Sequence, residues 1–99
     1  MKPFRWNPEK NEAIKADRGI SFERIVVAIE TDGLLDILMH PNQARYPRQR
    51  VLVVACDRYV YLVPFVEEKD YFFLKTVIPS RKATRDYLSQ SEGDADAED

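Results

Sequence analysis

Apolar residues in the first third of the chain recur at helical spacing. In SFERIVVAIETDG they stand three and four residues apart, which places them on one helix face: Phe22, Ile25, Val26 and Ile29. Ser21 precedes this run as a helix N-cap, and Gly33 ends it. The segment NPEKNEAIKADRG has Asn7 as its N-cap and Gly19 as its end. Two consecutive helices are therefore predicted.

After Gly33 the pattern changes from helical spacing to strands. A short edge strand is also predicted at residues 4–6. The four longer segments are rich in Val, Leu, Tyr and Phe: residues 34–40, 51–56, 59–67 and 71–79. The run VLVVAC is apolar on both faces, as in a central strand, and Pro64 is expected to disturb its strand because it lacks an N–H. A last helix is predicted from Arg81 to about Leu88.

This order of elements predicts an α+β fold. Two N-terminal helices should pack on an antiparallel sheet of about four strands, with a short C-terminal helix. We expect one domain over residues 1–90 and an acidic, disordered tail over residues 91–99. The sequence has neither a membrane-spanning run nor a signal-peptide h-region, and its single cysteine, Cys56, lies in a strand. A cytoplasmic protein with a buried thiol is expected.

The net charge of −2 conceals a basic domain. The last nine residues hold five acids and no base, so the remainder has 15 basic and 12 acidic residues. Residues 41–90 hold nine Lys and Arg against five Asp and Glu. This distribution favours a polyanionic partner.

Few kinds of catalytic site are compatible with this composition. One histidine and one buried cysteine give no zinc site, and neither a Gly-rich phosphate loop nor a nucleophile elbow is present. No metal and no cofactor are therefore expected. His40 ends a strand, where it could serve as an acid or base, or could instead bond locally in the HPN turn. The arginines that follow could hold phosphates or form a solvated loop: Arg45, Arg48 and Arg50.

Lys75 is a lone cation in an aromatic strand. It should reach a rim, a carboxylate or a ligand, and Asp36 is a candidate structural partner. Tyrosines near basic residues, including Tyr61 and Tyr71, could stack on RNA bases or belong to the core.

Three cations stand at the start of the last predicted helix: Arg81, Lys82 and Arg85. Anions are the stabilising choice there, by about 0.3–1 kcal/mol each. The cluster either binds a phosphate from outside or is merely screened by salt.

Three motifs in this order resemble the BrnT-type toxins, ribonucleases of bacterial type II toxin–antitoxin pairs. They are FRWNPEKNEAIK, RGISFERI and IPSRKATRDYL, which together span roughly residues 4–88. The resemblance implies a compact α+β fold similar to the RelE-like ribonucleases. It also implies RNA as the substrate, an antitoxin protein as partner, and an active surface near Arg81, Lys82 and Thr84. The segment MHPNQARYPRQR departs from the family, and Lys75 lies beside Thr76, near the place of a strand arginine in relatives.

Together these residues predict metal-independent RNA cleavage through attack by the 2′-hydroxyl. His40 or a tyrosine would move the proton, and Lys75, Arg81 and Lys82 would stabilise the phosphorane. RNA would be bound by the loop arginines, Tyr61, Tyr71 and Arg85. The alternative is a catalytically inactive interaction module that binds RNA or a protein through its basic face. We expect a homodimer or a toxin–antitoxin hetero-oligomer.

Overall fold

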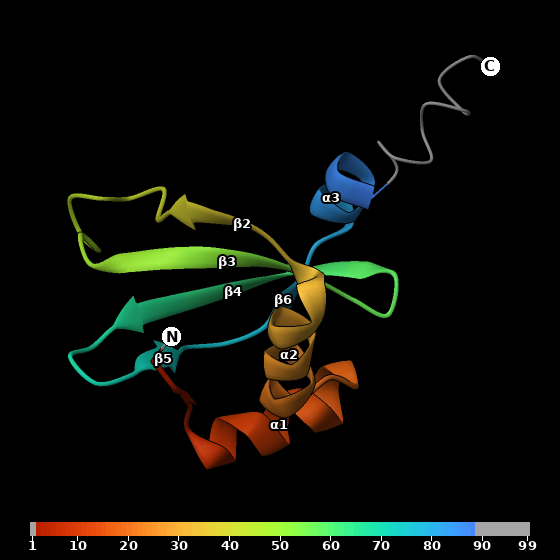
Figure 1. The fold of residues 1–99 in the computed structure, drawn as a ribbon, viewed down its shortest axis with the longest axis horizontal. Helices are drawn as coiled ribbons and strands as arrows, with labels where there is room; N and C mark the ends of the chain where they lie inside the picture. The colour runs from red at the N-terminus through yellow and green to blue at the C-terminus, as the bar shows by residue number, and fades with distance from the viewer. Residues whose placement is uncertain (1, 89–99) are drawn as a thin grey trace.

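The computed structural model describes residues 2–88 (Figure 1). Its helical segments are α1 (Pro8–Arg18), α2 (Phe22–Ala28) continued by the π-helical turn η1 (Ile29–Gly33), and α3 (Arg81–Ala83) continued by the π-helical turn η2 (Thr84–Leu88). Its strands are β1 (Phe4–Arg5), β2 (Leu34–Met39), β3 (Gln49–Cys56), β4 (Tyr59–Glu67), β5 (Phe72–Leu74) and β6 (Ile78–Pro79). The α+β class is confirmed. The proposed acidic tail, residues 91–99, lies outside the described residues.

α1 begins and ends, and α2 begins, where the sequence predicts, whereas α2 ends at Ala28, before the predicted end at Gly33, and continues as the π-helical turn η1. Asn7 Oδ1 accepts the N–H of Glu9 at 2.8 Å, and Gly19 ends α1 in the left-handed region with φ 67°. Ser21 Oγ accepts the N–H of Arg24 at 3.1 Å at the start of α2. Local capping chemistry thus sets these boundaries.

Asn11 joins the two helices from a buried position. Its Oδ1 accepts the N–H of Phe22 at 2.8 Å, and its Nδ2 donates to Glu23 Oε1 at 2.8 Å. This bond is the largest cause that lowers the pKa of the Glu23 carboxyl. A buried amide with both ends bonded holds α1 against the first turn of α2 without an unsatisfied polar group.

The sheet is larger than predicted and is not wholly antiparallel. Its strand order is β1-β5-β4-β3-β2, and β6 also pairs with β4. β1 runs parallel to β5, with Phe4 opposite Phe72, whereas the other pairs are antiparallel. The expectation of about four antiparallel strands was therefore wrong.

Pro64 explains why the predicted strand 71–79 is divided. The N–H of Lys75 donates to the Pro64 carbonyl at 2.8 Å, so the backbone of Pro64 faces this neighbour, to which it can donate nothing. The chain leaves β4 after this contact and returns when Ile78 pairs with Leu62. β4 itself continues, and Pro64 keeps its place opposite Val51 of β3.

The two faces of the sheet pack against different helices. On the face toward α1 and α2, the expected stripe is confirmed: Phe22, Ile25 and Ile29 are buried and Val26 is half-buried. The opposite face carries a smaller cluster, in which Val53 and Val60 pack with Ala83 of α3. α2 crosses the sheet near one end, and β2, β3 and β4 extend beyond it toward residues 40–48 (Figure 1). That projecting end brings charged residues together.

Gly33 allows η1 to approach β3 closely. A Cβ at this position would lie 2.6 Å from the carbonyl oxygens of both Ala28 and Ala55, which are backbone atoms. We expect Gly33→Ala to lower the free energy of unfolding by about 1–3 kcal/mol, the range for overpacking. Urea denaturation followed by circular dichroism measures this change. The matched variant is Gly19→Ala, which meets no atom within 4 Å and tests the cost of a positive φ alone. An unchanged midpoint for Gly33→Ala would contradict the close approach.

Candidate functional site

Charged side chains gather at the projecting end of the sheet, where β3 begins and β4 ends. They line an open depression that we call the charged hollow, formed by Lys2, Met39, Pro47, Arg48, Arg50, Glu67, Glu68 and Lys69. Four of these residues are cationic and two are anionic. The hollow therefore has an excess of positive charge around two carboxylates.

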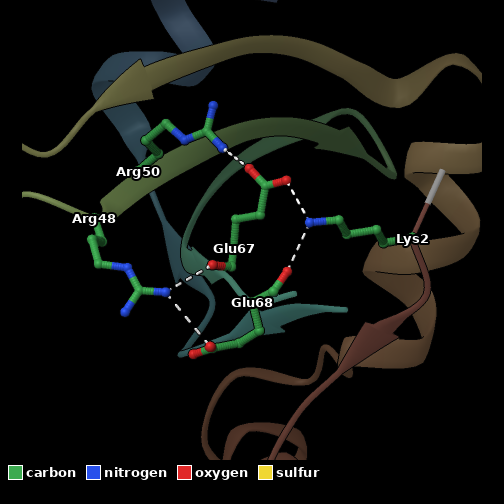
Figure 2. Close-up of polar contacts among 5 residues, drawn as sticks. All are labelled: Lys2, Arg48, Arg50, Glu67 and Glu68. Atoms are coloured by element: carbon green, nitrogen blue, oxygen red, sulfur yellow. Dashed lines mark hydrogen bonds and ion pairs between the residues drawn. The ribbon is translucent and has the colours of Figure 1, made fainter. Parts of the chain in front are cut away.

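Glu67 lies between two cations in this hollow. Its Oε1 accepts from Arg50 Nη2 at 2.7 Å, and its Oε2 accepts from Lys2 Nζ at 2.7 Å (Figure 2). The Glu67 side chain remains 41% exposed, so solvent or a ligand can reach the carboxylate. The hydrogen bond from Lys2 is the largest cause that lowers the pKa of Glu67, and Arg50 adds to it. Glu67 is thus an ionised, accessible carboxylate at neutral pH.

Arg48 and Glu68 extend the network along the rim. Arg48 Nη2 donates to the Glu67 carbonyl at 3.2 Å and lies 3.6 Å from Glu68 Oε1 (Figure 2). Lys2 Nζ also donates to the Glu68 carbonyl at 2.7 Å. The Arg48 side chain is 69% exposed, which leaves most of its guanidinium free for another anion.

An apolar depression adjoins the charged hollow on the helix-covered face. We call it the apolar hollow; it has a volume of about 240 Å³ and is lined by Phe4, Ile29, Leu34, Ile37, Leu52, Phe65 and Phe72, with Arg50 and Glu67 at its edge. Aromatic rings support both cations, since the Arg50 guanidinium lies 5.1 Å from the Phe65 ring centroid and Lys2 Nζ lies 5.6 Å from that of Phe72. Apolar surface and cationic side chains therefore meet at one place.

His40 bonds locally, as the second interpretation of HPN expects. Its Nδ1 accepts the N–H of Asn42 at 2.9 Å, and its ring lies 4.5 Å from that of Tyr46. The Arg45 guanidinium covers the same Tyr46 ring at 5.5 Å. This arrangement orders the loop, and it occupies the nitrogen through which His40 could otherwise accept a proton.

Lys75 and Asp36 do not form the expected pair. Asp36 Oδ1 accepts the N–H of Ile37 at 2.8 Å, and its Oδ2 accepts from the Tyr87 hydroxyl at 3.1 Å. Lys75 is exposed, with Nζ 6.0 Å from the Phe73 ring centroid. Lys75 therefore extends to the protein surface, which is the first of the three predicted outcomes: a rim, a carboxylate or a ligand.

The two predicted tyrosines have different surroundings. Tyr71 stacks under the Arg5 guanidinium at 5.4 Å, in a shallow depression beside β1. Tyr61 is half-buried against the main core, and burial is the largest cause that raises its pKa. A raised pKa makes the Tyr61 phenolate scarce at neutral pH, so this residue is poorly suited to accept a proton.

Arg81 and Lys82 are exposed on α3, and within residues 2–88 neither forms an ion pair. Two N–H donors in the first turn of this helix are engaged. Ser80 Oγ accepts the N–H of Ala83 at 3.0 Å, and the N–H of Thr84 donates to the Ser80 carbonyl at 2.9 Å. Thr84 Oγ1 accepts the N–H of Val60 at 2.8 Å, which ties the turn to β4. Arg85 lies 3.6 Å from Asp86.

The expected catalytic residues are not assembled in one site. The N–H of His40 donates to Gln49 at one end of β3, whereas the N–H of Ser80 donates to Val60, which pairs with Ala55 near the other end. Six residues of extended strand separate these levels by about 20 Å. Lys75 lies between them, at the level of Pro64. Among the predicted residues, Arg48 and Arg50 meet through Glu67, and His40 and Arg45 meet through the Tyr46 ring.

Sequence reasoning missed Lys2, Glu67 and Glu68. Lys2 stands 65 residues from Glu67 along the chain, so no spacing rule joins them. The strand register was the available signal, because an antiparallel hairpin over DR places residues near 50 opposite residues near 65.

Two classes of function find no support in the described residues. Among residues 2–88, no group of three or more His, Cys, Asp or Glu side chains could hold a metal ion. None of the helices in that same range has the length and apolar character needed to cross a bilayer. Comparisons with protein-family models, curated proteins and solved structures give no match to this chain.

Proposed function

We propose that this chain is a metal-independent ribonuclease, a BrnT-type toxin with a RelE-like fold, and that RNA is cleaved at the charged hollow. One observation carries the proposal: an ionised, accessible Glu67 carboxylate lies between Lys2 and Arg50, with the exposed Arg48 beside it. Such a carboxylate can accept a proton, while neighbouring cations that still have unused hydrogen-bond donors hold a phosphate.

Three residues of the charged hollow have roles in this reaction: Glu67, Arg48 and Arg50. Glu67 takes the proton of the 2′-hydroxyl, and the 2′-oxygen then forms a bond to phosphorus. Arg48 and Arg50 stabilise the negative charge that develops on the phosphorane oxygens. The bond from phosphorus to the 5′-oxygen breaks, and water protonates the leaving oxygen. The products are a 2′,3′-cyclic phosphate and a 5′-hydroxyl end, and no metal takes part.

The other predicted residues have binding roles in this scheme. Lys75, Arg81 and Lys82 are exposed cations at distances that a single catalytic centre cannot span, but that an extended RNA strand can. Tyr71 with Arg5 offers a stacking surface. An antitoxin protein is the partner that this assignment implies, and co-expression of the adjacent gene should then relieve growth inhibition.

Two double variants test where the reaction takes place. Arg48→Ala/Arg50→Ala and Arg81→Ala/Lys82→Ala each remove two cations, so their general electrostatic effects on RNA binding are matched. In EDTA, we expect the wild type to cut RNA and the first variant to lose about 10²–10³-fold in rate. The second variant should lose less than about tenfold. The reverse order would move the reaction to α3 and overturn the assignment to the charged hollow.

The uncovered apolar surface favours one second function, a non-enzymatic interaction module. Leu35, Ile37, Leu38 and Met39 are exposed on β2, and the apolar hollow opens beside them. Such surface on a small domain is typical of a protein-binding face. The same assay separates the two functions, because wild-type protein that leaves RNA intact in the presence and absence of EDTA would support the module.

A further inference from the structure

The outer edge of β2 has little of the protection that usually keeps an edge strand from pairing with another chain. β2 is the last strand in the sheet order, and within residues 2–88 it pairs only with β3. Natural edge strands are commonly protected by lysine, proline or a strong bulge. Residues Leu34–Met39 contain neither lysine nor proline, and their register irregularity, between Leu34 and Asp36, leaves Asp36–Met39 in regular pairing with β3. Four of their apolar side chains are 38–66% exposed.

The backbone hydrogen-bonding groups that face away from β3 on this edge belong to Ile37 and Met39. The N–H of His40 donates to Gln49 of β3, and in an antiparallel pair every second residue bonds to the same neighbour. Ile37 and Met39 therefore direct their N–H and C=O away from β3. The N–H of Ile37 is held by the carboxylate of the adjacent Asp36, which confirms that it does not bond to β3.

We propose that this edge pairs with the β2 edge of a second copy of the same chain. The two strands would run antiparallel about a two-fold axis at Ile37, so that two six-stranded sheets become one. Ile37 N–H would then donate to Ile37 C=O of the other copy, in place of the contact with Asp36. This proposal does not depend on the ribonuclease assignment.

The sequence of β2 is self-complementary in this register. Centring on Ile37 places Leu35 opposite Met39 on the face of the apolar hollow, and Asp36 opposite Leu38 on the other face. The neighbouring register, centred on Asp36, would oppose two carboxylates and is disfavoured. A register centred on Leu38 would oppose Leu35 and Pro41, which has no N–H to donate.

The charge of the strand favours a second copy over a charged partner. Asp36 is its single charged residue, and its carboxylate is already bonded to the Tyr87 hydroxyl. A basic or acidic peptide would therefore find no complementary charges along this edge. An identical strand matches apolar to apolar side chains on the face of the apolar hollow, where Ile37 meets Ile37 and Leu35 meets Met39, which gives burial as well as backbone pairing.

The oligomeric state of the full chain tests this pairing. We expect a dimer in sedimentation equilibrium over a concentration series. Ile37→Lys should raise the dimer dissociation constant by at least about 100-fold, because each dimer loses two buried isoleucines and gains two facing charges. The matched control is Val27→Lys, which alters another exposed apolar residue, 57% exposed on α2, and should leave the dimer unchanged.

A second variant distinguishes strand pairing from packing of side chains. Ile37→Pro removes the outward N–H and leaves the bonds between β2 and β3, so it should also give a monomer with native circular dichroism. A dimeric Ile37→Pro would overturn strand pairing. A wild type that stays monomeric throughout the series, or an Ile37→Lys variant that dimerises as the wild type does, would overturn the interface itself.

Discussion

Glu67→Gln is expected to lower the rate of RNA cleavage by about 10²–10⁴-fold, the usual contribution of a general base. Glutamine keeps the shape of the side chain, but its single acceptor oxygen can keep only one of the two hydrogen bonds from Lys2 and Arg50, and it cannot take a proton. RNA affinity should be retained or slightly increased, since the hollow loses one negative charge. Initial rates on a fluorogenic RNA in EDTA, together with binding to a 2′-deoxy analogue, measure the two effects separately.

The neighbouring glutamate is the matched control for this substitution. Glu68→Gln also removes one carboxylate from the charged hollow, but the Glu68 carboxylate pairs with Arg48 at 3.6 Å and is not bonded to Arg50. Its rate should stay within about tenfold of the wild type, the scale of one screened surface charge. Equal losses in the two variants would mean that net charge matters and that Glu67 has no chemical role.

The pH dependence identifies the base independently. Lys2 and Arg50 hold the pKa of Glu67 below its ordinary value of 4.5, so its ionised form persists as the pH falls through 6 and 5. The rate should therefore be flat across this range and decline only below about pH 4.5. A histidine base would instead lose activity near its ordinary pKa of about 6.5. A decline centred there would return the proton transfer to His40.

Phe22→Ala is expected to lower the free energy of unfolding by about 3–5 kcal/mol. The Phe22 side chain is fully buried, and the Trp6 ring stacks on it with centroids 5.5 Å apart. Its backbone N–H also anchors Asn11. Since a domain of this size is stable by only about 5–15 kcal/mol, one such cavity removes a large share of the total. Urea denaturation monitored by Trp6 fluorescence and circular dichroism measures the loss.

Val27→Ala provides the comparison on the same helix. Val27 is 57% exposed, so its truncation should change the free energy of unfolding by no more than about 0.5 kcal/mol. A similar loss for both variants would mean that burial of Phe22 is not the cause, and helix propensity could not explain it, because alanine has the highest helix propensity. A small loss for Phe22→Ala alone would mean that α2 does not pack on the sheet as described.

Features set by neighbouring residues were predictable from the sequence. Asn7, Gly19 and Ser21 cap helices where their types and positions indicate, and the stripe of α2 is buried as its spacing requires. The local alternative for His40 likewise follows from its own turn, in which Asn42 donates to the ring. Such interactions join residues a few positions apart, so they form with little dependence on the rest of the fold.

Features set by strand register were not predictable in the same way. The division of the predicted strand 71–79 depends on whether the backbone of Pro64 faces β5. The parallel pairing of β1 depends on the N-terminal segment lying beside β5. His40 and Arg81 each occupy the predicted local structure, yet the length of β3 keeps them about 20 Å apart.

The sequence by itself determined the α+β class, both ends of α1, the start of α2, the apolar stripe and the basic character of residues 41–90. Tertiary structure alone decided which charges meet. Lys2, Arg50 and Glu67 come from distant parts of the chain and converge because β3 and β4 pair in one register and the N-terminus lies beside β5. Burial of apolar side chains and backbone pairing select the register of β3 and β4. The charged side chains at the end of these strands are brought together by that register and do not determine it.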